Sequence, residues 1–384
     1  GHGQVPEGGV APSWCASPSA GCQLACSLVA LAFKVFCFKS HQMALCGTHR
    51  GAFPRCKSVA CNMISPVQAQ GKVSMSFPLH DAAWYESMYN NRALVPDNGE
   101  YLQRWADDSA AVRRSQGSVL DLAYGNGASE TLDIFPAVGM QSDAGAPVLV
   151  FVHGGYWIAL DKSDHSFVAP AFCQEGCCVV VVNYALCPGS ASHPVTIPTI
   201  LDQMERALAW VGDHIAGHGG DPGRITVAGH SAGGQIAAML LCTAGRGEGS
   251  TRPAPGLRSA LSISGVHDLE PLMHTPRYQS VLQLTPEQIQ QASPARQPAP
   301  VLGELWCAAG GGESAEFLRQ NQLMQAAWGP RIMPQCAALP GLNHFSILDS
   351  LATPGQALHE MALGLLRAPC VTSTDVRPHC LPRG

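Results

Sequence analysis

From residue 118 onward, the chain alternates short runs of β-branched and apolar residues with longer stretches of helical periodicity. Several of the short runs are nearly continuous in Val, Ile, Leu and Ala, which is typical of strands covered by helices on both faces. This alternation predicts an α/β fold with a mostly parallel, doubly wound sheet of about eight strands flanked by helices. The expected strands are Val119–Tyr124, Thr131–Phe135, Pro147–Val152, Cys178–Tyr184, Arg224–Ala228, Ala260–Ser264, Gly303–Ala308 and Met333–Ala338.

Local patterns refine this expectation at two places. The first two strands are joined by the short, turn-rich loop Gly125–Ser129, which favours an antiparallel hairpin at the edge of the sheet. The segment 200–215 has the clearest helical period, with apolar residues falling on one face. Those residues are Ile200, Met204, Leu208, Val211 and Ile215.

The composition is that of a globular protein with a large core. Apolar residues make up 46% of the 384 residues and charged residues only 13%. The charged share is about half of the usual roughly 25%, which excludes a highly charged disordered chain. The formal net charge of −5 provides no basic surface for nucleic acid. We therefore expect a small-molecule substrate and no nucleic-acid partner.

Residues 1–74 differ in composition from the rest of the chain. They hold seven of the 16 cysteines and six of the 23 Lys and Arg residues, but only one of the 28 acidic residues. Their one apolar run, Ser27–Phe38, is interrupted by Lys34 and is shorter than the roughly 20 residues of a spanning helix, so we expect no membrane partner. The absence of long periodicity predicts a disordered extension over 1–74, a functional domain over 75–368 and a tail over 369–384.

The cysteine spacing in the first segment raises the alternatives of zinc and of disulfides. Cys22 and Cys26, like Cys56 and Cys61, are closely spaced, but no second well-spaced pair and no His-x₃₋₅-His partner completes a zinc site. A disulfide framework needs an oxidising compartment, and nothing in the sequence assigns one. We therefore expect no metal and a cytoplasmic location.

A Gly-x-Ser-x-Gly sequence lies between a predicted strand and a predicted helix. Gly229-His230-Ser231-Ala232-Gly233 follows the strand Arg224–Ala228 and precedes the apolar segment 234–241. In a nucleophile elbow of this kind, small flanking residues let the serine protrude, and the next amide faces the reacting carbonyl. The five-residue pattern alone is common by chance, and the strand-turn-helix setting gives it weight. The sequence therefore predicts Ser231 as a nucleophile.

A pair of glycines follows an earlier strand. Pro147–Val152 is succeeded by His153-Gly154-Gly155-Tyr156-Trp157. Adjacent glycines let the backbone approach a ligand closely and present N–H groups to an oxyanion, although Gly-Gly by itself is also a plain tight turn. Combined with the elbow, the pair predicts an oxyanion hole formed by the amides of Gly154, Gly155 and Ala232.

The base that activates the serine is expected late in the chain. Elbow proteins place their groups in the order Ser, acid, His, and His344 follows the last predicted strand in Gly341-Leu-Asn-His-Phe345. His214 and His218 could suggest a metal pair, but nearby glycines end the helix around them, and we interpret them as solvated. His230 is expected to orient the turn rather than act as the base.

Two carboxylates compete as the acid that orients His344, and neither is excluded. Glu313 follows the strand Gly303–Ala308 in a glycine-rich loop, which would bring its carboxylate to the strand end. Asp268 follows the preceding strand. We favour Glu313, with Asp268 or neither as the alternatives. Glu316 is expected on the first turn of the next helix, where a negative charge interacts favourably with the helix dipole.

At this point the sequence resembles a known family, because it looks like an α/β-hydrolase of the kynurenine formamidase (arylformamidase) type. The resemblance covers residues 75 to about 366, and Glu313 departs from it because many members carry aspartate there. The segments that carry it are His153-Gly-Gly-Tyr-Trp157, Gly229-His-Ser-Ala-Gly233, Asn183-Tyr-Ala-Leu-Cys-Pro188, Glu313-Ser-Ala-Glu-Phe317 with Arg319-Gln320, Leu342-Asn-His-Phe345 and Tyr89-Asn-Asn-Arg92.

The resemblance implies a function and a set of site residues. It implies a triad of Ser231, Glu313 and His344 that hydrolyses N-formyl-L-kynurenine to kynurenine and formate, a step of tryptophan catabolism. The acyl group of a formamide is one carbon, whereas the aromatic leaving group needs a large slot. Residues expected to line that slot are Tyr156, Trp157 and Phe345, although aromatic residues near a strand end are as often part of the core. The partner is thus a small aromatic formamide; no cofactor is required, and a homodimer is compatible with the sequence.

The residues by themselves leave two other functions open. A general carboxylesterase of the same fold would use the same three groups on an ester substrate. A catalytically silent binding protein would keep the fold without the reaction, although the intact Ser, Glu and His set argues against it.

Overall fold

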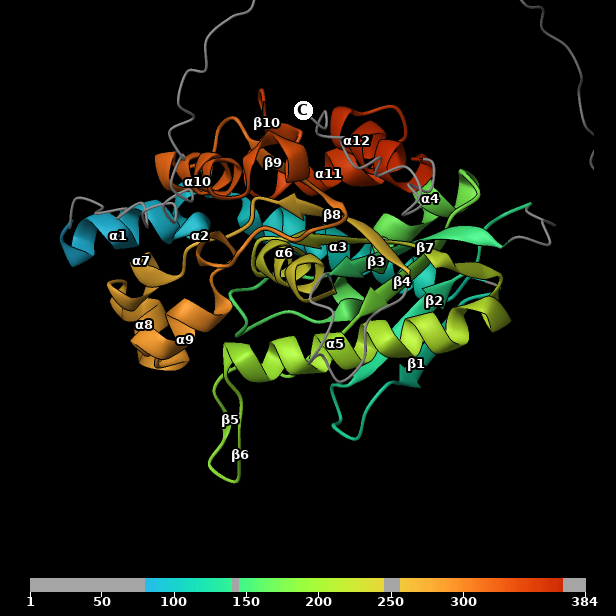
Figure 1. The fold of residues 1–384 in the computed structure, drawn as a ribbon, viewed down its shortest axis with the longest axis horizontal. Coiled ribbons are helices and arrows are strands. Elements are labelled where there is room, and N and C mark those ends of the chain that lie inside the picture. Colours follow the sequence, from blue (N-terminus) through green and yellow to red (C-terminus); the bar gives the residue numbers. More distant parts are fainter. Residues whose placement is uncertain (1–79, 116, 140–144, 245–255, 369–384) are drawn as a thin grey trace, which may run out of the picture. The chain divides into compact units, whose positions relative to one another are not determined.

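An eight-stranded sheet forms the centre of the computed structural model, which describes residues 80–115, 117–139, 145–244 and 256–368. The strand order is β1-β2-β4-β3-β7-β8-β9-β10 (Figure 1). The predicted extension 1–74 and tail 369–384 lie outside the described residues. The strands are β1 Val119–Ala123, β2 Thr131–Phe135, β3 Ala146–Val152, β4 Cys178–Val182, β7 Gly220–His230, β8 Leu257–Ile263, β9 Glu304–Gly310 and β10 Gln335–Leu339.

The predicted mostly parallel sheet is confirmed. From β4 to β10 every neighbouring pair is parallel, whereas β1 pairs antiparallel with β2, and β2 pairs antiparallel with β4. The loop Gly125–Ser129 therefore closes an antiparallel hairpin at the edge of the sheet, as expected. A separate two-stranded ribbon of β5 (Gly189–Ser190) and β6 (His193–Pro194), too short to be predicted, follows β4.

Both faces of the sheet are buried, which explains the nearly continuous apolar runs. In β3, Val148, Val150 and Val152 pack into one core with helices α5 (Ile197–His214) and α6 (Ala232–Ala244). Leu149 and Phe151 alternate with them and pack into the opposite core with α4 (Ala169–Gln174), α11 (Ser346–Ala352) and α12 (Ala357–Arg367). In Figure 1, α5 and α6 lie on one side of the strands, and α11 and α12 lie on the other. Alternation on a doubly covered sheet thus requires an apolar side chain at every position.

The helices that cover the sheet follow the expected pattern. α5 (Ile197–His214) confirms the predicted amphipathic helix; it begins after the N-cap Thr196, whose side chain accepts from the Thr199 amide at 3.3 Å. No helix in the described ranges is long and apolar enough to cross a membrane. The remaining covering helices are α4 Ala169–Gln174, α6 Ala232–Ala244, α10 Ala315–Ile332, α11 Ser346–Ala352 and α12 Ala357–Arg367.

Two chain segments that are distant in sequence contribute helices at one end of the sheet. The first precedes β1, and the second is inserted between β8 and β9. Helices α1, α2, α7, α8 and α9 gather at this end (Figure 1), and α1 contacts α7, α8 and α10. The bounds of these helices are α1 Ala82–Tyr89, α2 Asn91–Leu94, α7 Glu270–Met273, α8 Pro276–Leu282 and α9 Pro286–Ala292. A further helix before β1 is α3 Asn98–Arg113.

Candidate active site

Ser231 occupies a strained turn between β7 and α6. Its φ is +56°, in the left-handed region that few non-glycine residues adopt. A Cβ at Gly229 would lie 2.0 Å from the carbonyl oxygen of Gly233, and one at Gly233 would lie 2.1 Å from the carbonyl oxygen of Val152. The turn is therefore closed so tightly that only glycine fits at both flanking positions, which is the requirement of a nucleophile elbow.

Glu313 and His344 form a close pair. Glu313 lies in the loop after β9 and His344 in the loop after β10, and His344 Nδ1 is 2.6 Å from Glu313 Oε2. The other carboxylate oxygen, Oε1, accepts from the Ser264 hydroxyl at 2.5 Å and from the Gly310 amide at 2.6 Å. The Glu313 side chain is completely buried. A carboxylate held in this way fixes the imidazole with its Nδ1 proton toward Glu313, which leaves Nε2 as the basic nitrogen.

Ser231 and His344 line the same cavity, which has a volume of about 250 Å³. Among the described residues, no hydrogen bond joins the Ser231 hydroxyl to His344. Such contacts are commonly long without substrate and shorten when substrate binds. The arrangement thus places a serine, and a histidine paired with a carboxylate, at one cavity beside the ends of β7, β9 and β10.

Gly155 lines this cavity, while Gly154 and Ala232 adjoin Ser231 from the loop after β3 and from the start of α6. Gly155 has a φ of +103°, and a Cβ there would lie 2.1 Å from the carbonyl oxygen of Ala159; a Cβ on Gly154 would lie 3.0 Å from Ser231 Cβ. Within the described part of the chain, no hydrogen bond takes up the N–H groups of Gly154, Gly155 or Ala232. Ala232 also begins α6, whose dipole adds positive potential at that end. These amides are free to donate to an oxyanion beside Ser231.

Of the three aromatic residues that the sequence assigned to a substrate slot, two line the cavity and one does not. Tyr156 and Phe345 line the cavity. Trp157 does not: its side chain is fully buried in the core, and its Nε1 donates to Gln235 Oε1 at 3.2 Å. The expectation for Trp157 is therefore wrong. Its φ of +59° continues the left-handed turn begun at Tyr156, so the two neighbouring side chains diverge.

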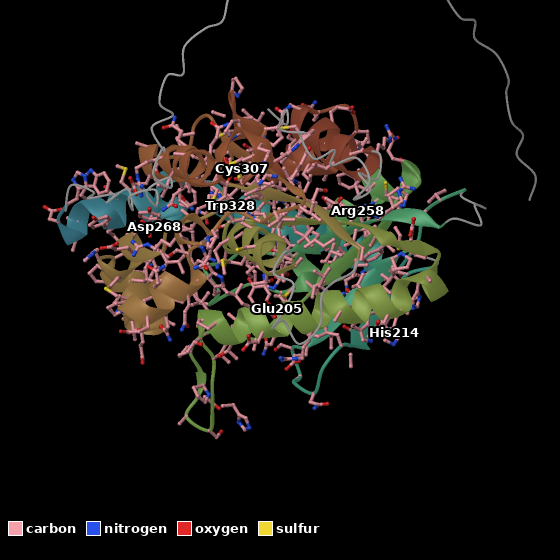
Figure 2. All side chains as sticks on the ribbon, viewed as in Figure 1. Glu205, His214, Arg258, Asp268, Cys307 and Trp328 are labelled. Atoms are coloured by element: carbon pink, nitrogen blue, oxygen red, sulfur yellow. The ribbon has the colours of Figure 1, made fainter. Side chains whose placement is uncertain are left out.

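Asp268, the competing carboxylate, and Glu316 have other partners. Asp268, labelled in Figure 2, precedes α7 and accepts from Arg296 Nε at 3.0 Å. Glu316 lies on the first turn of α10, as expected, and it accepts from Arg319 Nε at 2.6 Å and from the Tyr89 hydroxyl at 2.7 Å. The structure therefore joins Glu313, and neither of the other two, to His344.

His230 contacts His344 in a way that sequence reasoning missed. Its Nε2 donates to the backbone carbonyl oxygen of His344 at 2.8 Å, and the two ring centroids are 4.7 Å apart. Burial, together with the nearby His344, lowers the pKa of His230 well below its usual value, so the ring stays a neutral donor. The two residues are 114 positions apart, and no local pattern signals such a contact.

The other histidine pair is not part of the site. His214, labelled in Figure 2, is exposed at the end of α5. Its ring stacks on that of Trp210 with ring centroids 4.4 Å apart. No cluster of three or more His, Cys, Asp or Glu side chains that could hold a metal ion occurs in the described ranges.

Comparisons with known proteins agree with this architecture. A family model for the alpha/beta hydrolase fold matches residues 149–301, which include the elbow. A solved structure from Silicibacter sp. TM1040, provisionally described as a thioesterase, is 28% identical with a TM-score of 0.61, over 71% of this chain and 96% of that one. An esterase from Pyrobaculum calidifontis shares the fold at 18% identity, with a TM-score of 0.52 over 75% and 98% of the two chains. The sheet topology and these comparisons show that the chain has the α/β-hydrolase fold.

The chain is also similar to kynurenine formamidases. It is 26% identical to the kynurenine formamidase of Danio rerio over 258 residues, which are 65% of this chain and 82% of the fish protein. It is 27% identical to that of Salmo salar over 261 residues, with the same coverage. The resemblance seen in the sequence is thereby confirmed. Esterase LipQ of Mycobacterium tuberculosis is 32% identical over 164 residues, 41% of this chain and 37% of LipQ.

Proposed function

We propose that this α/β-hydrolase cleaves the formamide of N-formyl-L-kynurenine to kynurenine and formate. Ser231 is the nucleophile, His344 the base and Glu313 the acid that orients it. The observation that carries the proposal is the 2.6 Å contact between His344 and Glu313 beside the cavity that Ser231 lines. The choice of substrate is supported by the similarity to kynurenine formamidases of two fishes.

The first half of the reaction forms an acyl-enzyme. His344 Nε2 takes the proton of the Ser231 hydroxyl while Oγ attacks the formyl carbon, and the carbonyl electron pair moves to oxygen. The amides of Ala232 and of Gly154 or Gly155 donate to that oxyanion. The intermediate collapses as the carbon–nitrogen bond breaks, and the proton on His344 passes to the aniline nitrogen. Kynurenine leaves, and the formyl group remains on Ser231.

The second half releases formate. A water molecule gives its proton to His344 Nε2 and attacks the formyl ester carbon. Collapse of the second tetrahedral intermediate breaks the bond to Ser231 Oγ, which recovers its proton from His344. Throughout, the Glu313 carboxylate stabilises the imidazolium that forms twice in the cycle.

The lining of the cavity suits an aromatic leaving group. Tyr156 and Tyr278 stack with ring centroids 3.9 Å apart and planes inclined by 19°, and Phe345 lies beside His344 in the sequence and on the same cavity. Flat apolar surfaces of this kind bind an aryl ring. A formyl group is a single carbon, so the acyl side of the site needs little space.

A carboxylesterase activity is the second candidate, favoured by the similarity to LipQ. The two functions share the same machinery and differ in the group transferred. We expect kcat/KM for N-formyl-L-kynurenine to exceed that for phenyl acetate and phenyl butyrate. Efficient ester cleavage with formamide hydrolysis at the background rate would support the esterase instead.

A chemical probe separates both enzymes from a silent binding protein. A fluorophosphonate reacts only with an activated serine, so it should label the wild-type protein and fail to label Ser231→Ala. Labelling of Ser231→Ala at the wild-type level would show that the reaction is nonspecific. Absence of labelling in folded wild-type protein would favour the binding protein.

A further inference from the structure

The cavity beside Ser231 carries an unbalanced positive charge. Its lining is mostly apolar, but Arg92 and Arg277 reach it from the helices at the end of the sheet. No Asp or Glu side chain is among the lining residues in the described ranges. Two guanidinium groups without a carboxylate on the same wall attract an anion. The catalytic groups described above do not use either arginine.

The two arginines differ in their partners. Arg277 Nε donates to Glu86 Oε1 at 2.6 Å, which neutralises much of its charge. The Arg92 guanidinium has no ion pair or hydrogen bond with any residue in the described part of the chain. A planar guanidinium in this state can take a carboxylate with two parallel hydrogen bonds. Arg92 is therefore the better candidate for an anion ligand.

Asn91 provides a second, independent indication of a ligand. Asn91 lines the cavity and is only 5% exposed, and its buried Nδ2 has no hydrogen-bond partner among the described residues. A buried donor without a partner is unfavourable by about 1–3 kcal/mol, and such groups are rare in folded proteins. An oxygen atom of a bound ligand would satisfy it.

The backbone that carries both residues is fixed at the cavity. The carbonyl oxygen of Tyr89 accepts from the Tyr156 hydroxyl at 2.6 Å and from the Tyr278 hydroxyl at 3.0 Å. The Tyr89 hydroxyl donates to Glu316 Oε2 at 2.7 Å, which ties the segment to α10. Asn91 and Arg92 are thus held against the same tyrosines that line the site, and a ligand would meet them already in position.

We infer that Arg92 and Asn91 form a subsite for a carboxylate on the leaving-group part of the substrate. Arg92 supplies the charge, and Asn91 supplies one further hydrogen bond. The inference rests on the proposed function, because N-formyl-L-kynurenine carries its α-carboxylate on the part that leaves as kynurenine. With this subsite, the enzyme selects anionic aryl formamides over neutral ones.

The test is a ratio of two specificity constants measured on the full chain. The numerator is kcat/KM for N-formyl-L-kynurenine, and the denominator is kcat/KM for formanilide, which has no carboxylate. Arg92→Gln should lower this ratio about 10- to 100-fold, mainly through KM, since charge-assisted hydrogen bonds are lost. Arg92→Lys should restore part of it, and Asn91→Ala should lower it by a smaller factor.

A matched control variant and a second pair of substrates complete the test. Arg277→Gln, the other arginine on the cavity, should change the ratio by less than about threefold. An equal loss on both substrates in Arg92→Gln, or a larger effect of Arg277→Gln, overturns the subsite while the proposed function stands. If the wild-type protein cleaves neither formamide, the proposed function fails. The ratio for 3-acetoxybenzoate over phenyl acetate then tests the subsite, and an unchanged ratio in Arg92→Gln overturns it.

Discussion

Glu313 reaches His344 because its carboxylate is held from the other side. One oxygen accepts from Ser264 and from the Gly310 amide, which leaves the second oxygen for the imidazole. Glutamate has one more methylene than aspartate, and here its carboxylate reaches the imidazole directly. The departure from the family pattern at this position is thus compatible with an orienting acid.

Comparison of two amide substitutions tests which carboxylate orients the base. Glu313→Gln keeps the size of the side chain but removes the charge that fixes the tautomer of His344, and it should lower kcat by about 10⁴-fold. Asp268→Asn should leave kcat within about threefold of wild type, because Asp268 pairs with Arg296. A crippled Asp268→Asn alongside an active Glu313→Gln would refute the assignment.

The site residues differ in how far sequence could predict them. Ser231 and His344 follow from a motif and from chain order, since both depend on local sequence and on the order of strands. The choice between Glu313 and Asp268 stayed open because both follow strands that end at the same edge. Trp157 was assigned wrongly because adjacent residues in a left-handed turn point in different directions.

At the scale of elements, the elbow depends on close contact between β7, α6 and the end of β3. The residues that make this contact are glycines, and a Cβ at either Gly229 or Gly233 would overlap a backbone oxygen. Backbone atoms cannot move aside as a flexible side chain can. The strained φ of Ser231 is therefore maintained by the packing of three elements rather than by local preference.

Gly229→Ala should damage both stability and activity. The added methyl group would overlap the Gly233 carbonyl, so we expect the free energy of unfolding to fall by about 3 kcal/mol and turnover to fall sharply. Gly217→Ala is the control, because nothing lies within 4 Å of a Cβ there, and its unfolding free energy should change by less than about 1 kcal/mol. Urea denaturation measures both. Equal stability of the two variants would contradict this account of the turn.

Sequence patterns predicted the sheet better than the helices at its end. All eight expected strands are present, because continuous apolar runs are a strong signal. Their ends are shifted by up to four residues. Helices α7, α8 and α9 were not predicted. They are four to seven residues long, too short for a helical period to stand out, and α7 and α8 contact the distant α1.

At the scale of the whole molecule, several histidines are buried as neutral groups. Burial lowers the pKa of His165 and of His267 to about 3, and it lowers the pKa of His153 and His230 as well. In the unfolded chain these side chains titrate near their usual value of about 6.5. Below that pH the unfolded state binds more protons than the folded state, so stability is full above pH 6.5 and declines as the pH falls toward 3.

The contribution of one such histidine can be measured. At pH 4.5, a residue with a folded pKa of about 3 reduces the unfolding free energy by about 3 kcal/mol relative to pH 7. His267→Gln should therefore show a loss between pH 7 and 4.5 that is smaller than in wild type by about this amount. His193→Gln, at an exposed position, should match the wild-type loss. Identical losses in all three proteins would show that His267 is protonated in the folded state.

Removal of residues 1–74 tests the predicted domain boundary. The composition break near residue 75 and the lack of periodic elements before it predict that the chain 75–384 folds and works alone. We expect the truncated protein to keep the thermal midpoint and kcat/KM of the full chain within about twofold. Loss of most turnover, or insolubility under conditions in which the full chain is soluble, would assign the segment a structural role.

The most direct test of the central claim is turnover of N-formyl-L-kynurenine by the wild-type protein and by Ser231→Ala, with kynurenine and formate measured separately. The account predicts that the wild type releases the two products in equal amounts, and that Ser231→Ala is slower by about 10⁶-fold, with only binding and oxyanion stabilisation left. Turnover at the background rate in the wild type would contradict the substrate assignment, and retained activity in Ser231→Ala would contradict the mechanism.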